Sequence, residues 1–212
     1  MQKGYFITFE GPDGAGKSTQ IKLLETYLKE KGLEVVLTRE PGGTRISEKI
    51  REIILNKTHT EMSDVTEALL YAASRAQHVH EVIKPALLAG KVVICDRFVH
   101  SSLAYQGNGR ELGEDMVWAV NAPAVDGIMP DLSFFVMLDE KHVLSRLEAS
   151  GKDLDRLERE KVDFFKRVNA AYHKMAVDSD RVLRLDASES IESIAAKIKN
   201  AAKNTLKLKK LT

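Results

Sequence analysis

Residues 11–18, Gly-Pro-Asp-Gly-Ala-Gly-Lys-Ser, have the types and spacing of a phosphate-binding loop. In the pattern G-x-x-x-x-G-K-[ST], the glycines let backbone N–H groups close around phosphate oxygens. Lys17 reaches the β- and γ-phosphates, and the Ser18 hydroxyl can bind Mg²⁺. The loop follows the apolar run 5–9 and precedes a helical pattern that starts near Lys17, so a positive helix end faces the same phosphates. We therefore predict that the chain binds a nucleoside triphosphate.

Two further groups of candidate residues follow other apolar runs. The run 34–38 leads into Arg39-Glu40-Pro41-Gly42-Gly43, and the run 91–95 leads into Asp96-Arg97-Phe98. A carboxylate that closes a strand beside a phosphate-binding loop is well placed near Mg²⁺, so Asp96 joins Ser18 as a candidate metal ligand. Arg97 can direct two N–H donors at a phosphate. The alternatives are a plain turn for the first segment and a local ion pair for the second.

The elements that must position these residues alternate along the chain. Short apolar runs at 5–9, 34–38, 91–95, 132–138 and 181–185 are separated by helical patterns. This alternation predicts an α/β fold with a mainly parallel sheet, helices on both faces, and ligands at the carboxyl ends of the strands. Ser63 to Ala89 is expected to be one long helix, with Ser63, Thr66 and Glu67 as start signals and Gly90 as the stop. No repeat or linker divides the chain, so residues 1–212 are predicted to form one domain.

Composition excludes some functions. Lys and Arg total 32 against 31 Asp and Glu, so the chain lacks the basic field that gathers nucleic acid. The single cysteine, Cys95, excludes an intrachain disulfide and is expected to be buried. No signal segment and no apolar run of membrane-spanning length is evident, which favours a cytoplasmic protein without a membrane partner. We expect Trp118 to pack in the core near the rim of the acceptor pocket.

The segments 9–20, 38–44 and 96–107 together resemble thymidylate kinase, and the resemblance extends from Phe6 to about Tyr172. It implies the P-loop nucleoside-monophosphate-kinase-like three-layer fold, with five parallel strands and a short lid. It also implies reversible transfer of the ATP γ-phosphoryl group to dTMP, giving dTDP for dTTP synthesis, with Mg²⁺, and a homodimer formed through the 63–89 helix. The acceptor phosphate, with a second pKa of about 6, is already anionic near neutral pH, so no general base is needed.

The resemblance also implies roles for individual residues. Lys17, Arg97 and Arg156 are the implied catalytic residues. The implied ATP-binding residues are Gly11, Pro12, Asp13, Gly14, Ala15, Gly16, Lys17, Ser18, Thr19 and Arg146. The implied dTMP-binding residues are Asp13, Arg39, Pro41, Tyr71, Arg75, Arg97, Ser102, Tyr105 and Gln106. Among these, Asp13 would read the 3′-hydroxyl, and Tyr71 would stack on the thymine. Arg75, Ser102 and Gln106 would contact the base, Tyr105 would crowd the 2′ position, and Glu40-Pro41 would form a cis turn.

Residues of about 148–160 resemble the lid of this family, which closes over ATP and supplies an arginine. One variety of the family carries that arginine in the P-loop, at the position of Gly14, so here the lid must supply the charge. Arg156 is the first candidate and Arg146 the second, with Lys152 and Arg159 as further alternatives. The chain departs from the common Arg-Gly pattern at Ser150-Gly151. The basic tail, about 205–212, is expected to be a solvated end.

Three other functions stay open at this point. The first is a P-loop kinase for another nucleoside monophosphate or for a deoxynucleoside, for which Glu10 is the only early candidate base. The second is a switch GTPase, although the Asn-Lys-x-Asp motif that reads guanine is missing. The third is an inactive nucleotide sensor, which Lys17, Ser18, Asp96 and Arg97 argue against.

Overall fold

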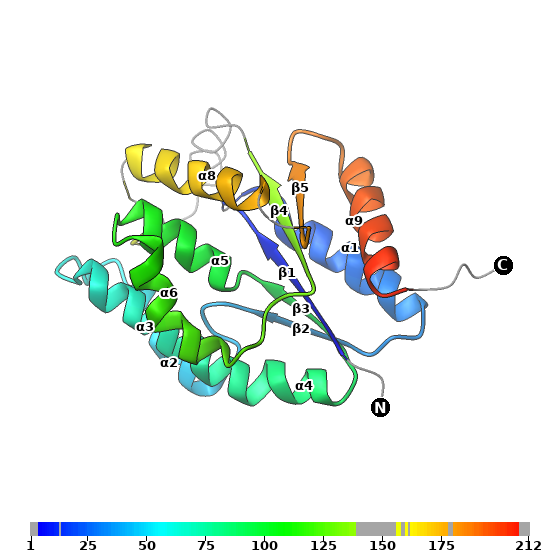
Figure 1. Cartoon of the computed structure of the whole chain (residues 1–212), viewed down its shortest axis with the longest axis horizontal. Coiled ribbons are helices and arrows are strands. Elements are labelled where there is room, and N and C mark those ends of the chain that lie inside the picture. Colours follow the sequence, from blue (N-terminus) through cyan, green and yellow to red (C-terminus); the bar gives the residue numbers. More distant parts are fainter. Residues whose placement is uncertain are drawn as a thin grey trace.

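A computed structural model describes residues 4–12, 14–138, 156–157, 160, 162–177 and 180–207. Their fold is a parallel sheet held between two layers of helices (Figure 1). The strand order is β2-β3-β1-β4-β5, and every neighbouring pair is parallel. The five strands are β1 (Tyr5–Glu10), β2 (Val35–Arg39), β3 (Val92–Asp96), β4 (Leu132–Met137) and β5 (Val182–Asp186). The predicted three-layer fold is confirmed.

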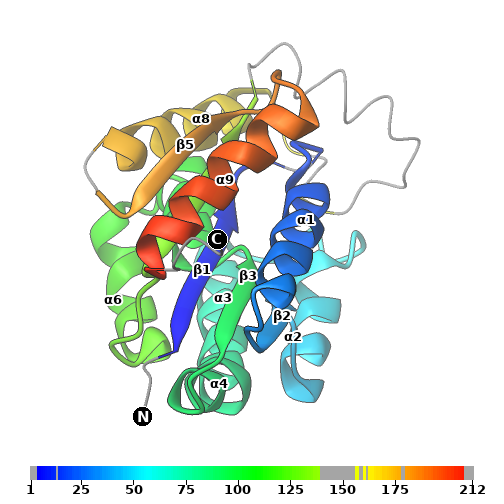
Figure 2. The same cartoon turned by 90° about the vertical axis from the view of Figure 1, so that its right-hand side faces the viewer.

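The helices divide between the two faces of the sheet. One face is covered by α1 (Lys17–Glu30) and α9 (Ile191–Thr205), which lie side by side in Figure 2. The other face carries α2 (Arg45–Leu55), α3 (Asp64–His78), η1 (Val79–Ile83), α4 (Lys84–Leu88), α5 (Val99–Ser102), η2 (Leu103–Gly109), α6 (Glu114–Val125) and α8 (Val162–Val177). Here η denotes a π-helical segment.

The pleat of each strand decides on which face of the sheet its last side chains lie, because successive side chains point to opposite faces. In β1, Ile7 and Phe9 pack in the cluster beneath α1 and α9, whereas Phe6 packs on the opposite face. Phe9 is in register with Asp96 of β3, so Asp96 belongs to the α1 face. Glu10, one residue beyond Phe9, faces the other layer. The end of β3 therefore places Asp96 on the α1 face of the sheet, and the end of β1 places Glu10 on the opposite face.

The predicted helix over 63–89 has the predicted ends but an unexpected interior. It begins at Asp64, where the Ser63 hydroxyl accepts the Thr66 N–H at 3.1 Å, and it ends before Gly90. Between these ends, Val79–Ile83 is π-helical. Pro85 explains the change, because it has no N–H for the carbonyl four residues earlier and its ring crowds that carbonyl.

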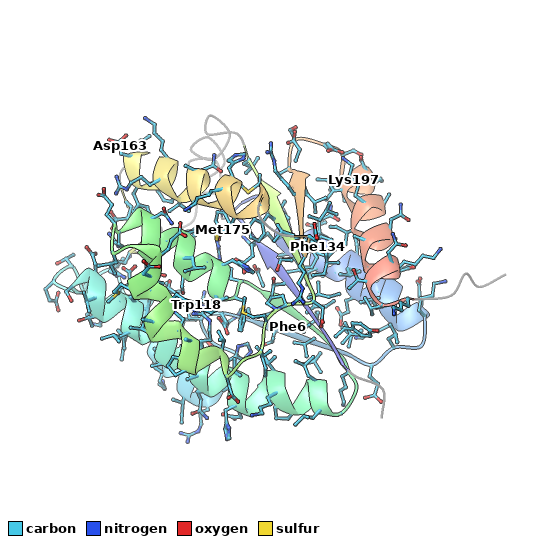
Figure 3. All side chains as sticks on the ribbon, viewed as in Figure 1. Phe6, Trp118, Phe134, Asp163, Met175 and Lys197 are labelled. Atoms are coloured by element: carbon cyan, nitrogen blue, oxygen red, sulfur yellow. The ribbon has the colours of Figure 1, made fainter. Side chains whose placement is uncertain are left out.

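Side-chain burial confirms one expectation and corrects another. Cys95 is a free, buried thiol, and burial raises its pKa well above the usual value. Trp118 is 39% exposed, so the prediction that it packs in the core is wrong. Figure 3 shows Phe6 and Phe134 on the central strands, whereas Trp118 lies on the outer helix α6. Within the described residues, no helix combines the length and apolar character needed to cross a bilayer.

Candidate active site

The glycine loop after β1 adopts a conformation that depends on its glycines. Gly11, Gly14 and Gly16 have φ values of 122°, 75° and 90°, a region that side chains disfavour. A Cβ on Gly11 would lie 2.1 Å from the Val136 carbonyl oxygen, so no larger residue fits there. Helix α1 begins at Lys17, as predicted. Asp13 lies outside the described residues.

Lys17 is buried at the start of α1, and its ammonium group turns back into the loop. Its Nζ donates to the Gly11 carbonyl at 3.0 Å and to the Pro12 carbonyl at 2.9 Å. These contacts hold the cation where the loop would surround a phosphate.

Asp96 and Ser18 form an oxygen donor set beside this loop that suits Mg²⁺. Within the described part of the chain, Asp96 Oδ1 is buried and has no hydrogen-bond partner, an arrangement that calls for a cation or an ordered water. Ser18 lies in the first turn of α1. Mg²⁺ usually keeps several waters and takes only one or two protein ligands. The same ranges contain no group of three His, Cys, Asp or Glu residues that could form an all-protein metal cage.

A cavity of about 270 Å³ opens on the other face of the sheet. Its lining residues are Glu40, Pro41, Arg51, Leu55, Tyr71, Arg75, Arg97, Phe98, Ser101, Ser102, Tyr105, Gln106, Leu157 and Phe165. Seven of the predicted acceptor-site residues are brought together here: Pro41, Tyr71, Arg75, Arg97, Ser102, Tyr105 and Gln106. A volume of this order suits a small-molecule ligand.

Arg39, which is also predicted to bind dTMP, does not line the cavity in this structure. Its guanidinium donates to the Pro41 carbonyl at 3.0 Å and pairs with Glu48 at 3.0 Å. Arg51 of α2 instead reaches the cavity and donates to the same Pro41 carbonyl at 2.8 Å. Sequence reasoning missed Arg51 because it follows no strand.

Arg97 places its guanidinium between the strand ends and α8. The residue has a φ of 71°, which departs from the β3 conformation and directs the side chain into the cavity. Nη1 donates to Ser101 Oγ at 3.2 Å, and Nη2 donates to Tyr105 Oη at 3.4 Å. The guanidinium carbon lies 5.2 Å from the Tyr105 ring centroid, which adds a cation–π contact.

Glu10 joins the two parts of the site. Its backbone leads directly into the glycine loop, while its buried carboxyl group accepts the Phe98 N–H at 2.8 Å and the Ser101 hydroxyl at 2.5 Å. Burial raises the pKa of Glu10 to about 7, although the Ser101 hydrogen bond and the Arg97 charge oppose the shift. Glu10 therefore fixes the segment that carries Arg97 relative to the loop that carries Lys17.

A buried polar network supports the inner wall of the cavity. Arg75 is 1% exposed, and its Nε donates to Glu40 at 2.8 Å while Nη1 donates to Ser102 at 3.1 Å and to Asn121. The other Glu40 oxygen lies 2.9 Å from His78 Nδ1. The Glu40–Pro41 peptide is cis. The ion pair balances the two buried charges, and its hydrogen bonds fix the direction of the guanidinium.

Arg156 lies at the outer edge of the cavity, beside the lining residue Leu157. Its Nε donates to the Ile54 carbonyl at 3.0 Å, and its Nη2 donates to Glu67 at 2.5 Å. Arg146, Lys152, Arg159 and most of the segment 148–160 lie outside the described residues, as does the tail from 208 onward.

A phosphate-binding loop on one face of a parallel sheet and an arginine-lined acceptor cavity on the other define a P-loop kinase of the nucleoside monophosphate class. The family model for thymidylate kinase matches residues 9–198, so the chain belongs to the thymidylate kinase family. Membership assigns it that family's reaction, the phosphorylation of dTMP to dTDP with ATP.

Individual relatives agree with this assignment. The chain is 52% identical to a thymidylate kinase of Geobacillus sp. (strain WCH70), over 92% of this chain and 93% of the relative. It is 50% identical to a thymidylate kinase of Pelotomaculum thermopropionicum, over 96% and 95% of the two chains. A crystal structure of thymidylate kinase from Ehrlichia chaffeensis superposes with a TM-score of 0.77 at 31% identity, covering 95% of this chain and 99% of that one.

Proposed function

We propose that this chain binds ATP at the glycine loop and dTMP in the 270 Å³ cavity, and joins the two phosphates at the ends of β1 and β3. The observation that carries the proposal is the position of Arg97, which reaches into the cavity from the strand-end segment that Glu10 ties to the loop. Arg51 lines the same cavity, so a second guanidinium group borders the place that we propose for the acceptor phosphate.

Catalysis in this proposal depends on position and charge. The acceptor phosphate oxygen is anionic near neutral pH and attacks without a base. Lys17, Arg97 and Arg156 would stabilise the charge on the equatorial oxygens of the transferring phosphoryl group. Arg156 contacts Glu67 at the cavity edge, so its guanidinium already lies on the acceptor side. In the proposed acceptor site, Tyr71 stacks on the base and Tyr105 crowds the sugar, while Arg39 supports the Pro41 turn from outside.

Ser18 and Asp96 are the residues we propose for Mg²⁺, which would supply charge neutralisation at the β- and γ-phosphates when bound. The buried Asp96 Oδ1 supports this assignment. Chelation by EDTA is expected to abolish turnover, and added Mg²⁺ is expected to restore it. Because ATP is the phosphoryl donor, the cytoplasm, where ATP is supplied, is the compartment we propose.

We also propose a homodimer built on α2, α3 and α6. Large apolar side chains are exposed on these three helices: Ile46, Ile53, Val65, Leu69 and Trp118. Helix α3 packs against both α2 and α6, so the exposed residues belong to neighbouring elements. A self-complementary apolar face of this kind suits a second copy of the chain related by two-fold symmetry.

The experiment that tests the reaction is a coupled ADP-release assay with MgATP. The acceptors dTMP, dUMP, dCMP, dGMP, AMP and thymidine are offered separately. We expect turnover with dTMP to exceed turnover with every other acceptor. Faster turnover with another monophosphate would leave the phosphate-binding residues in place but overturn the base-site assignments. ATP binding without ADP release from any acceptor would favour a nucleotide sensor.

A further inference from the structure

Glu67 of α3 is a buried carboxylate on which the side chains of three residues from other segments converge. It is 0% exposed. Gln106 Nε2 donates to Glu67 Oε1 at 2.8 Å, while Arg110 Nη2 and Arg156 Nη2 donate to Oε2 at 3.0 and 2.5 Å. The two guanidinium groups offset the cost of burying the charge. The sequence suggested only a helix-start signal at this position.

The contact with Glu67 fixes the orientation of the Gln106 amide. A carboxylate only accepts hydrogen bonds, so the Gln106 group that faces Glu67 must be the NH₂ group. Gln106 is 1% exposed and lines the cavity. Its amide oxygen has no hydrogen-bond partner among the residues that the structure describes. That oxygen is therefore the group that Gln106 can offer to a ligand in the cavity.

The resulting set of donors and acceptors matches thymine better than cytosine. Arg75, which only donates, lies beside Ser102 at 3.1 Å, and both residues line the same cavity as Gln106. Thymine presents an N3–H donor between two carbonyl acceptors, whereas cytosine has an acceptor at N3 and an amino donor in place of O4. A fixed amide oxygen pairs with N3–H but repels the bare N3 of cytosine.

We propose that Glu67 is a positioning residue for base selection. By holding the Gln106 amide in one orientation, it sets the cavity for thymine over cytosine. The inference rests on dTMP as the acceptor and on Gln106 as a base contact, and it assigns Glu67 a role in setting that contact. Without the carboxylate, the amide can turn and offer NH₂ to N3 of cytosine.

The test uses Glu67→Gln, whose own amide can face Gln106 with either group. Values of kcat/KM are measured for dTMP and dCMP with MgATP. The dTMP-to-dCMP ratio is expected to fall by at least about tenfold, chiefly through KM. Loosening of Arg156 would affect both acceptors alike and cancels in the ratio. Titration of each monophosphate in the absence of ATP gives a second ratio that is free of chemistry.

Glu160→Gln is the matched control. Glu160 pairs with Arg110 at 2.5 Å, so this variant disturbs the same cluster without removing the partner of Gln106. Its ratio should equal that of the wild type. In a Gln106→Met background, Glu67→Gln should cause no further change in the ratio, because the amide through which it acts is gone.

The outcomes separate this inference from the proposed reaction. A wild-type enzyme that selects dTMP, together with a Glu67→Gln enzyme of unchanged ratio, would overturn only the role of Glu67. A wild-type enzyme without preference for dTMP would overturn the acceptor assignment itself. If thermal melting shows that Glu67→Gln does not fold, Gln106→Met decides, since an unchanged ratio there removes the amide from base selection.

Discussion

At the scale of single residues, Glu10 combines burial with a position between the glycine loop and the cavity. Its folded-state pKa of about 7 lies above the ordinary value of 4.5 because burial disfavours the charged form. The folded protein therefore binds a proton more tightly than the unfolded chain does. The stability that this proton contributes is fully present below about pH 4.5 and is lost as the pH rises to about 7.

Comparison with the Glu10→Gln variant, which cannot titrate at this position, should reveal that loss in the wild type. The unfolding free energy of the wild type relative to the variant is expected to fall by roughly 3 kcal/mol between pH 4.5 and 7. Urea unfolding at several pH values measures it. Glu114→Gln serves as a control of opposite sign, because a hydrogen bond from Lys174 lowers the pKa of Glu114. A flat difference for Glu10→Gln would contradict the raised pKa.

Arg156→Ala should separate phosphoryl transfer from acceptor binding. We expect kcat to fall by about 100-fold or more, because a charge that stabilises the transition state is lost, while KM for dTMP changes little. Steady-state kinetics with MgATP measure both constants. Arg167→Ala is the matched control, since Arg167 also anchors an element by donating to a carbonyl, that of Gly109. Near-normal kcat in Arg156→Ala would leave that residue a purely structural contact.

The sequence predicted residues that belong to motifs better than residues that support them. Lys17, Asp96 and Arg97 were identified because each follows a strand or lies in the loop, where ligands gather in such sheets. Glu67 lies in the first turn of its helix, where an acidic residue also suits the helix dipole, so its burial left no signal. Glu40 resembled only part of a turn, yet it is 4% exposed and anchors a buried network.

At the scale of elements, η2 is the segment that brings the base-side residues to the cavity, and α8 packs tightly against it. A Cβ on Gly109 would lie 2.7 Å from Phe164 and 2.9 Å from Val168 of α8. The wide turns of a π-helix depend on such local packing rather than on a residue pattern. Apolar periodicity therefore predicted where helices lie, but neither η1 nor η2.

Gly109→Ala is expected to destabilise the protein by about 1–3 kcal/mol, because α8 must shift to make room for the methyl group. It should also raise KM for dTMP, since Phe165 of α8 lines the cavity. Chemical denaturation and steady-state kinetics measure the two effects. Gly107→Ala lies in the same segment, but its added Cβ would meet no atom closer than 3.6 Å. Equal stability losses in the two variants would contradict the packing argument.

At the scale of the whole molecule, the helices on the cavity side serve two surfaces. Their inner residues line the acceptor cavity, and their outer residues include Leu69, which is 49% exposed. Trp118 is an example of a residue whose size and aromatic character predicted a place in the core. In the structure it lies instead on an outer face of α6. The surface that we propose for a second copy of the chain was not recognised from apolar periodicity, because exposed and buried apolar residues contribute to the same pattern.

Leu69→Arg should convert the proposed dimer to a monomer, because burying two symmetry-related charges against apolar neighbours is costly. Sedimentation equilibrium measures the mass. Leu88→Arg is the control, since Leu88 is exposed on α4, beyond the far end of α3. It should keep the mass of two chains. A wild type with the mass of one chain would contradict the dimer, as would a Leu69→Arg variant that keeps the mass of two.

The side chains of Asp96 and Arg97 lie on opposite sides of the sheet, and this arrangement limits how the sequence can change over evolutionary time. The two residues are adjacent, yet Asp96 belongs to the α1 face of the sheet and Arg97 lines the cavity on the other face. A single inserted or deleted residue within 92–97 would exchange the two faces and send a carboxylate toward the cavity. Length variation among descendants of this chain should therefore be confined to the surface connections. Strand β3, which separates the two substrate sites that we propose, can accept substitutions but no change in length.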